Sequence, residues 1–170
     1  MLAPEKGGRV ARGEAMLAWR EDGPASAPAL VLGNALGTEL SSWDPLMPYL
    51  VRHFRVIRFD ARGHGLSALD PQWAGRDYSI ALLARDTLAV ADAAGVKRFH
   101  YLGLSVGGML GLWLARHEPD RLDRLVVSNT AARLPPEVWV QRIEQVRASG
   151  LSALVDSTMQ RWFTPDFHGQ

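Results

Sequence analysis

A serine between two glycines is the residue of this sequence best suited to chemistry. Ser105 lies in residues 103–108, GLSVGG, which match the pattern G-x-S-x-G through Gly103 and Gly107. A serine that a tight turn forces out of regular backbone geometry needs neighbours without Cβ atoms. The same turn directs the amide of Val106 and the start of a helix toward the hydroxyl, where both would stabilise an oxyanion. The segment therefore predicts nucleophilic attack by Ser105 on a carbonyl carbon, against the alternative of a glycine turn that serves only helix packing.

A second glycine turn could supply another oxyanion donor. Residues 33–38, GNALGT, directly follow the apolar run 29–32. Glycines let the backbone approach a ligand closely, and by position the amide of Leu36 is the best donor. The alternative is an ordinary turn between a strand and a loop. Neither G-x-x-x-x-G-K-[ST] nor G-x-G-x-x-G is present here, which disfavours nucleotide binding.

A third turn contains a histidine. Residues 60–67, DARGHGLS, place His64 between two glycines, where it could act as a base. We favour the alternative that Asp60 and Arg62 pair and organise a structural turn. The other histidines are expected at helix ends, in a strand and near the end of the sequence: His53, His117, His100 and His168.

Strands and helices must alternate to position these turns. Short apolar runs, typical of strands buried on both faces, lie at 29–33, 55–60, 99–104 and 124–128. Helical segments lie between them, at 42–51, 80–94 and 106–117. The alternation predicts an α/β fold, with a mostly parallel sheet and helices on both faces. Residues 10–20 are expected to form a weaker strand or the arm of a hairpin.

The pattern changes after Asn129. Pro135 and Pro136 open a helix that carries Trp139 on its apolar face, Gly150 ends it, and a second helix begins near residue 151. Two amphipathic helices without a strand predict the start of a helical cap. We therefore expect a partial core over 1–132 and a partial cap over 133–170.

Composition limits the partners. The chain of 170 residues is 47% hydrophobic and 22% charged, which predicts a folded domain. Its 19 basic and 18 acidic residues leave a net charge of +1, so we expect a small-molecule partner rather than nucleic acid or a membrane. The absence of cysteine excludes a disulfide, a thiolate metal site and a cysteine nucleophile. No secretory signal or apolar stretch of about 18 residues is visible, so we expect a cytoplasmic protein.

The three turns resemble those of the α/β-hydrolase superfamily, and nearly the whole chain is similar to the 3-oxoadipate enol-lactonases of the protocatechuate pathway. The narrower similarity rests on residues 128–132, SNTAA, on 136–139, PEVW, followed by Arg142 and Ile143, and on 161–165, RWFTP. The resemblance implies hydrolysis of an enol-lactone to 3-oxoadipate, with Ser105 as the nucleophile and the amides of Leu36 and Val106 around the oxyanion. It implies no metal and no organic cofactor.

The resemblance also implies a substrate with a free carboxylate, which needs a cation nearby. Arg133 is the cation that follows the last strand most closely, with a solvated linker residue as the alternative. Trp139 could form a wall over the lactone ring, or could instead pack the cap against the core.

The acid and the histidine of the family are not assigned. In this fold they follow the serine on loops after later strands, and no such strand follows residue 128. Completing the pattern would take about 80 to 100 further residues, at about 30 for each strand–helix unit. Three interpretations stay open: a fragment of an enol-lactonase, another serine hydrolase such as a carboxylesterase or C–C bond hydrolase, or a non-catalytic binding module. We expect the 170-residue chain to be nearly inactive and to self-associate through an unpaired sheet edge.

Overall fold

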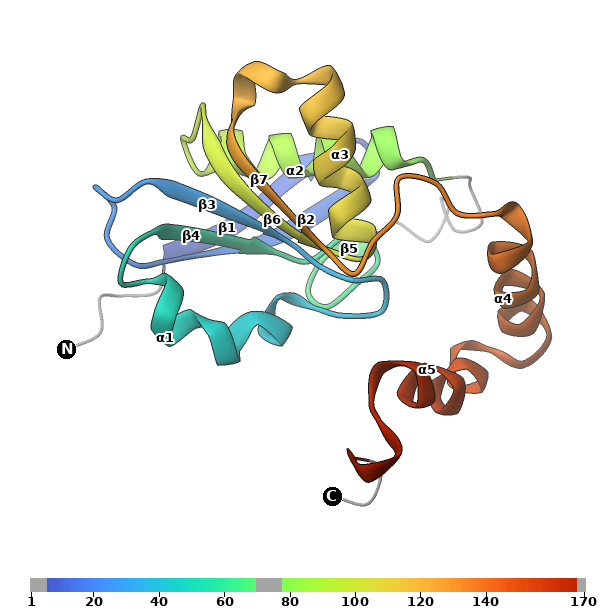
Figure 1. Cartoon of the computed structure of the whole chain (residues 1–170). Helices are drawn as coiled ribbons and strands as arrows, with labels where there is room; N and C mark the ends of the chain where they lie inside the picture. The colour runs from blue at the N-terminus through green and yellow to red at the C-terminus, as the bar shows by residue number, and fades with distance from the viewer. Residues whose placement is uncertain (1–5, 70–77, 168–170) are drawn as a thin grey trace. The chain divides into compact units, whose positions relative to one another are not determined.

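A computed structural model describes residues 6–69 and 78–167. It divides the chain into two compact units, residues 1–132 and residues 133–170. In the described part of the first unit, a seven-stranded sheet has the order β1-β2-β4-β3-β6-β7, with β5 paired to β2 (Figure 1). The strands are β1 (Lys6–Arg12), β2 (Ala15–Asp22), β3 (Ala29–Gly33), β4 (Arg55–Phe59), β5 (Ala68–Leu69), β6 (Phe99–Leu104) and β7 (Leu122–Ser128). Its helices are α1 (Met47–Leu50), α2 (Ile80–Ala93) and α3 (Val106–His117), with 3-10 turns at Leu40–Leu46 and Pro119–Arg121.

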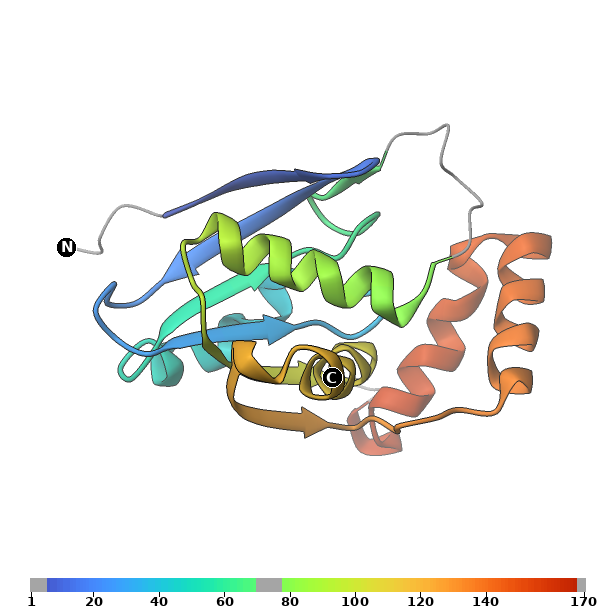
Figure 2. The ribbon, with the colours of Figure 1, turned by 90° about the horizontal axis from the view of Figure 1, so that it is seen from above.

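The expected α/β fold is confirmed. Strands β4, β3, β6 and β7 are parallel to one another, whereas β2 pairs antiparallel with β1, β4 and β5. Helices α2 and α3 cover one face of the sheet and α1 the other (Figures 1 and 2). Because the carboxyl ends of parallel strands meet at one edge of a sheet, the turns after β3, β4 and β6 come together there.

Two segments differ from expectation for reasons that lie in single residues. The expected single arm at 10–20 is a complete hairpin, β1 and β2, because Gly13 adopts φ +57 and turns the chain. The expected helix at 42–51 is instead a 3-10 segment followed by the four-residue α1. Pro45 lies inside the 3-10 segment, where it has no N–H to donate to a continuous α-helix.

The core lies on both sides of the sheet. A large cluster beneath α2 and α3 includes the fully buried Phe99, Tyr101 and Leu114. A smaller cluster, which includes Leu32 and Trp43, lies on the face that α1 covers. The central strands β3, β4 and β6 contribute side chains to these clusters, so the turns at their ends rest on a rigid base.

Strand β7 contradicts the expectation that every apolar run is buried on both faces. Val126 is 56% exposed and Val127 is 39% exposed. The reason is its place in the sheet, because among the described residues β7 pairs only with β6 and no strand lies on its other side.

The second unit contains α4 (Pro136–Ser149), a 3-10 turn at Leu151–Leu154, α5 (Val155–Trp162) and a 3-10 turn at Pro165–Phe167. Gly150, at φ +75, separates the first two. None of the side chains described between 133 and 167 is buried. No helix of the described chain has the length and hydrophobicity needed to span a membrane.

Candidate active site

Ser105 lies in the turn between β6 and α3, in a backbone conformation that is rare for a residue with a side chain. Its φ of 55° and ψ of −115° fall outside the regions favoured by L-amino acids. The turn is anchored on both sides: the Ser105 amide donates to the carbonyl of Ser128 at 2.9 Å, and the Thr130 hydroxyl donates to the Ser105 carbonyl at 2.6 Å. The surrounding structure therefore stabilises a strained serine at the end of a buried strand.

The glycines of the turn are required by close backbone contacts. A Cβ on Gly103 would collide with the carbonyl of Gly107, and a Cβ on Gly107 would collide with the carbonyl of Gly33. At Gly108, a Cβ would lie 2.7 Å from the Thr130 methyl group. These positions let α3 start directly against the ends of β3 and β7.

Hydrogen bonds join this turn to the one after β3. The Gly107 amide donates to the carbonyl of Asn34 at 3.0 Å, and the Tyr101 hydroxyl donates to the carbonyl of Gly107 at 2.9 Å. Burial raises the pKa of Tyr101, so its hydroxyl stays protonated and remains a donor. The Asn34 side chain donates to the carbonyl of Phe59 at 2.9 Å and accepts from the Trp43 indole at 2.7 Å. The ends of β3, β4 and β6 thus form one connected framework.

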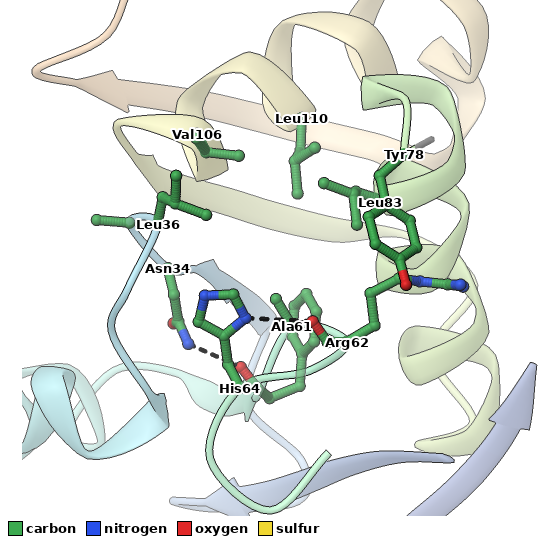
Figure 3. A pocket seen from close by; sticks show the side chains of 11 residues that line it. Asn34, Leu36, Ala61, Arg62, His64, Tyr78, Leu83, Val106 and Leu110 are labelled. Carbon is green, nitrogen blue, oxygen red and sulfur yellow. Dashed lines mark hydrogen bonds between the residues drawn. The ribbon is translucent and has the colours of Figure 1, made fainter. Parts of the chain in front are cut away.

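Leu36 and Val106, far apart in the sequence, line the same cavity of about 210 Å³ (Figure 3). Apolar side chains form much of its wall, including Phe59, Leu83 and Leu110. The amides of Gly37, Ser105 and Gly107 all donate to protein acceptors. Within the described residues, the amides of Leu36 and Val106 have no such acceptor, so both are available to a ligand.

His64 also lines the cavity, but both ring nitrogens have protein partners. Nε2 accepts from the Gly37 amide at 3.1 Å, and Nδ1 lies 3.2 Å from the carbonyl of Arg62 (Figure 3). A nitrogen that accepts an amide hydrogen is not available to take a proton from Ser105. The interpretation of this segment as a structural turn agrees with these contacts.

The expected pairing of Asp60 with Arg62 within that turn is wrong. The Asp60 carboxylate accepts from the amides of Leu40 at 2.7 Å and Leu66 at 2.8 Å. The Arg62 guanidinium instead forms two 2.7 Å hydrogen bonds with Asp86 on α2. These bonds raise the pKa of Arg62. Both residues still organise the turn, but through partners from other segments.

The other predicted residues belong to the second unit. Arg133 is exposed, and Trp139 is half-buried beneath the Arg142 guanidinium, 5.8 Å from its ring centre. Their proposed contacts with substrate stay predictions. Across the described chain, no group of three histidine, aspartate or glutamate side chains could hold a metal ion.

Sequence reasoning did not single out Thr130 or Tyr101 as supports of the serine turn. The signal for Tyr101 was weak, because a tyrosine in a strand is ordinarily a core residue. A signal for Thr130 lay in the preceding Asn129, because asparagine adopts positive φ more readily than most residues, and here its φ is +47.

Comparisons with known proteins agree with this geometry. A family model described as "alpha/beta hydrolase fold" matches residues 28–162. A 3-oxoadipate enol-lactonase from Acinetobacter baylyi is 38% identical over 146 residues, which cover 85% of this chain and 53% of the relative. The chain spans about half the length of the curated relatives it matches.

Two solved structures are similar over most of the chain. A hydrolase from Pseudomonas aeruginosa PA01 has a TM-score of 0.89 at 43% identity, covering 96% of this chain and 62% of the other. The enol-lactonase from Burkholderia xenovorans LB400 has a TM-score of 0.87 at 42% identity, covering 95% and 62%.

Proposed function

Because this chain belongs to the alpha/beta hydrolase fold family, we propose that it carries the nucleophile and the oxyanion donors of a 3-oxoadipate enol-lactonase. The product would be 3-oxoadipate, an intermediate of protocatechuate catabolism. Support comes from the enol-lactonase relative and from the similar enol-lactonase structure. In this proposal residues 1–132 are part of the hydrolase core and residues 133–170 begin the cap.

One observation carries the catalytic part of the proposal. In the two turns, the amides of Leu36 and Val106 donate to no protein acceptor among the described residues, and both residues line one cavity. Two open N–H groups at one cavity, one of them on the residue after a strained serine, fit the arrangement that stabilises the oxyanion of a tetrahedral intermediate. A turn that served helix packing alone would have no reason to leave both amides open.

The mechanism follows from these positions. The Ser105 oxygen attacks the lactone carbonyl, and the carbonyl oxygen becomes an oxyanion between the amides of Leu36 and Val106. Collapse breaks the bond to the ring oxygen, which leaves as an enol and tautomerises to the ketone. Water then releases the acyl group from Ser105. In the scheme of this family, a histidine held by an acidic residue moves the protons. We assign neither of these two residues among the described contacts of Ser105.

Substrate selection would involve the second unit. We propose that Arg133 binds the free carboxylate of the lactone and that Trp139 covers the ring. Arginine offers a planar fork that matches a carboxylate. The alternatives are a solvated linker for Arg133 and cap packing for Trp139.

A carboxylesterase that acts on neutral substrates is the second candidate. It is favoured by the cavity itself, because the Asn34 amide, the Arg62 guanidinium and the His64 ring already have protein partners. An apolar cavity with satisfied polar groups fits a neutral acyl chain as well as an anionic ring.

Kinetics on the complete gene product tests the proposal. We expect preference for the anionic enol-lactone over a panel of neutral esters, and a loss of kcat on the order of 10⁶-fold in Ser105→Ala. Preference for neutral esters would establish the carboxylesterase instead. An Ser105→Ala variant with unchanged turnover would refute serine catalysis at this site.

A further inference from the structure

We propose that His64 is a positioning residue, whose imidazole joins the turn after β4 to the turn after β3 and so holds the Leu36 amide in place. This inference rests on the proposed function, because it assigns the orientation of one oxyanion donor. The observation behind it is that one side chain joins the turn after β3 to the turn after β4.

The contacts of His64 select one tautomer of its ring. The Gly37 amide can only donate, so Nε2, which lies 3.1 Å from it, must be without hydrogen. The Arg62 carbonyl can only accept, so Nδ1, at 3.2 Å, must carry the hydrogen. Together these contacts select the neutral tautomer that is protonated on Nδ1.

The turn that receives this contact has little other support. Among the described residues, the bond from Gly37 to His64 is the only hydrogen bond that joins residues 35–39 to another segment. The remaining bonds of the turn are local, such as the one from the Thr38 amide to the Ala35 carbonyl at 3.3 Å. Leu36 is 49% exposed, and the space beside Gly37 is open. Loss of the His64 contact would therefore free the Leu36 amide to reorient.

The turn that contains His64 is rigid by comparison. Its own amide donates to the Ala61 carbonyl at 2.9 Å, and its carbonyl accepts from the Ser67 amide at 2.9 Å. Arg62 is fixed by its buried bonds with Asp86 and by an ion pair with Glu14. The imidazole thus anchors the loosely held turn after β3 to the rigid turn after β4.

Among the described groups, the nearby charges are already engaged. The carboxylate of Asp60 accepts from the amides of Leu40 and Leu66, and the guanidinium of Arg62 is paired with Asp86 and Glu14.

The remaining neighbours in the cavity are apolar or already engaged. Tyr78 lines the same cavity with its ring 5.6 Å from the Arg62 guanidinium, and Leu83 of α2 and Leu110 of α3 are apolar. Glu39, which is exposed, accepts from the Ser41 hydroxyl at 2.7 Å.

Nuclear magnetic resonance on the 170-residue chain tests the contact without substrate. We expect the His64 ring nitrogens to report the Nδ1-protonated tautomer at pH 8. In His64→Leu, exchange of the Gly37 amide should accelerate about tenfold, the factor for loss of one hydrogen bond. In His64→Gln, whose side-chain oxygen can accept a hydrogen bond, exchange should stay within about threefold of wild type.

Kinetics of the complete gene product tests the consequence. His64→Leu should lower kcat about tenfold and change KM less than about twofold. The loss of kcat is expected to be smaller than the roughly 100-fold loss caused by removing an oxyanion donor, because the Leu36 amide is misplaced and not removed. His64→Gln should restore kcat. The matched control is His117→Gln at the end of α3, because the Nδ1 of His117 also lies near a carbonyl, that of Trp113 at 3.0 Å, but contacts neither turn. It should leave both measurements unchanged.

Two results would overturn the proposal. An Nε2-protonated tautomer would remove the contact itself, and unchanged exchange of the Gly37 amide in His64→Leu would do the same. Unchanged kcat in His64→Leu, in an enzyme that Ser105→Ala inactivates, would remove its role in catalysis. The NMR results could agree with the expectation while the complete gene product opens no lactone. In that case the proposed substrate is wrong, but the hydrogen bond between Gly37 and His64 is supported.

Discussion

The first unit buries charges in one region and exposes valines in another. Arg58, in the inner strand β4, is 2% exposed, and Asp86, in the helix α2, is 1% exposed. Val126 and Val127, on the outer strand β7, are 56% and 39% exposed. This reverses the ordinary preference of these residue types for surface and core.

The difference shows that a side chain is buried here where the fold places a suitable partner beside it. Arg58 pairs with Asp22 at 2.9 Å and with Asp44, and Arg62 with Asp86 and Glu14. A buried charge costs free energy unless it is paired in this way. The valines of β7 lie on a strand that has β6 on one side and no described strand on the other. The paired charges support the turns of the candidate site, whereas the valines leave one edge of the sheet open.

The largest expected effect on the free energy of unfolding is at Asp86, whose replacement would remove its buried ion pair with Arg62. Asp86→Ala leaves the buried Arg62 without its main partner and should lower the free energy of unfolding by about 3–5 kcal/mol. Urea denaturation measures it. The matched control is Asp92→Ala on the same helix, where the aspartate pairs with Arg121 on the surface and its loss should cost at most about 1 kcal/mol. Equal losses in both variants would contradict the comparison.

A smaller effect is expected at Glu21, which tests the same region through pH. The Arg55 guanidinium, hydrogen-bonded to Glu21 at 2.6 Å, lowers the pKa of that carboxyl below its ordinary value of 4.5. The carboxyl therefore stabilises the folded chain fully above its unfolded pKa, and this contribution is lost as pH falls through the lower folded pKa.

The test compares wild type with Glu21→Gln at several pH values. We expect the variant to be less stable by about 2 kcal/mol at pH 7, the scale of a hydrogen bond to a charged group. The difference should shrink below pH 4.5. Glu144→Gln, at an exposed position of α4, should show no such pH dependence. A difference that stays constant down to acid unfolding would show that Glu21 is not held in its charged form.

Local patterns were enough to predict the elements and the serine turn. The strands at 29–33 and 99–104 and the helix at 106–117 are confirmed at the expected residues, because apolar periodicity and glycine punctuation are local signals. The partners of Arg62 were missed, because Asp86 lies 24 residues away and only the fold brings it near. The hydrogen bond from Gly37 to His64 was missed for the same reason, because the two residues are 27 positions apart.

The exposed strand β7 also shows that a local sequence pattern does not reveal which segments become neighbours in the fold. The run 124–128 has the composition of a buried strand, and the sequence predicts what that strand prefers, not whether a neighbour is present. Pattern reasoning therefore placed β7 in the sheet and was wrong about its burial. Environment is a property of the assembled fold, so it needs the structure.

The smallest effect on folding is expected at this edge, where we propose that copies of the chain associate. Val126→Lys places a charge on an exposed strand, which should prevent association while changing the free energy of unfolding by at most about 0.5 kcal/mol. Sedimentation velocity measures it, with Val140→Lys, at a 48% exposed valine on α4, as the control. We expect the wild type and the control to associate and Val126→Lys to be monomeric. A monomeric wild type would show that an exposed apolar edge alone does not drive association, and association of all three would place the contact elsewhere.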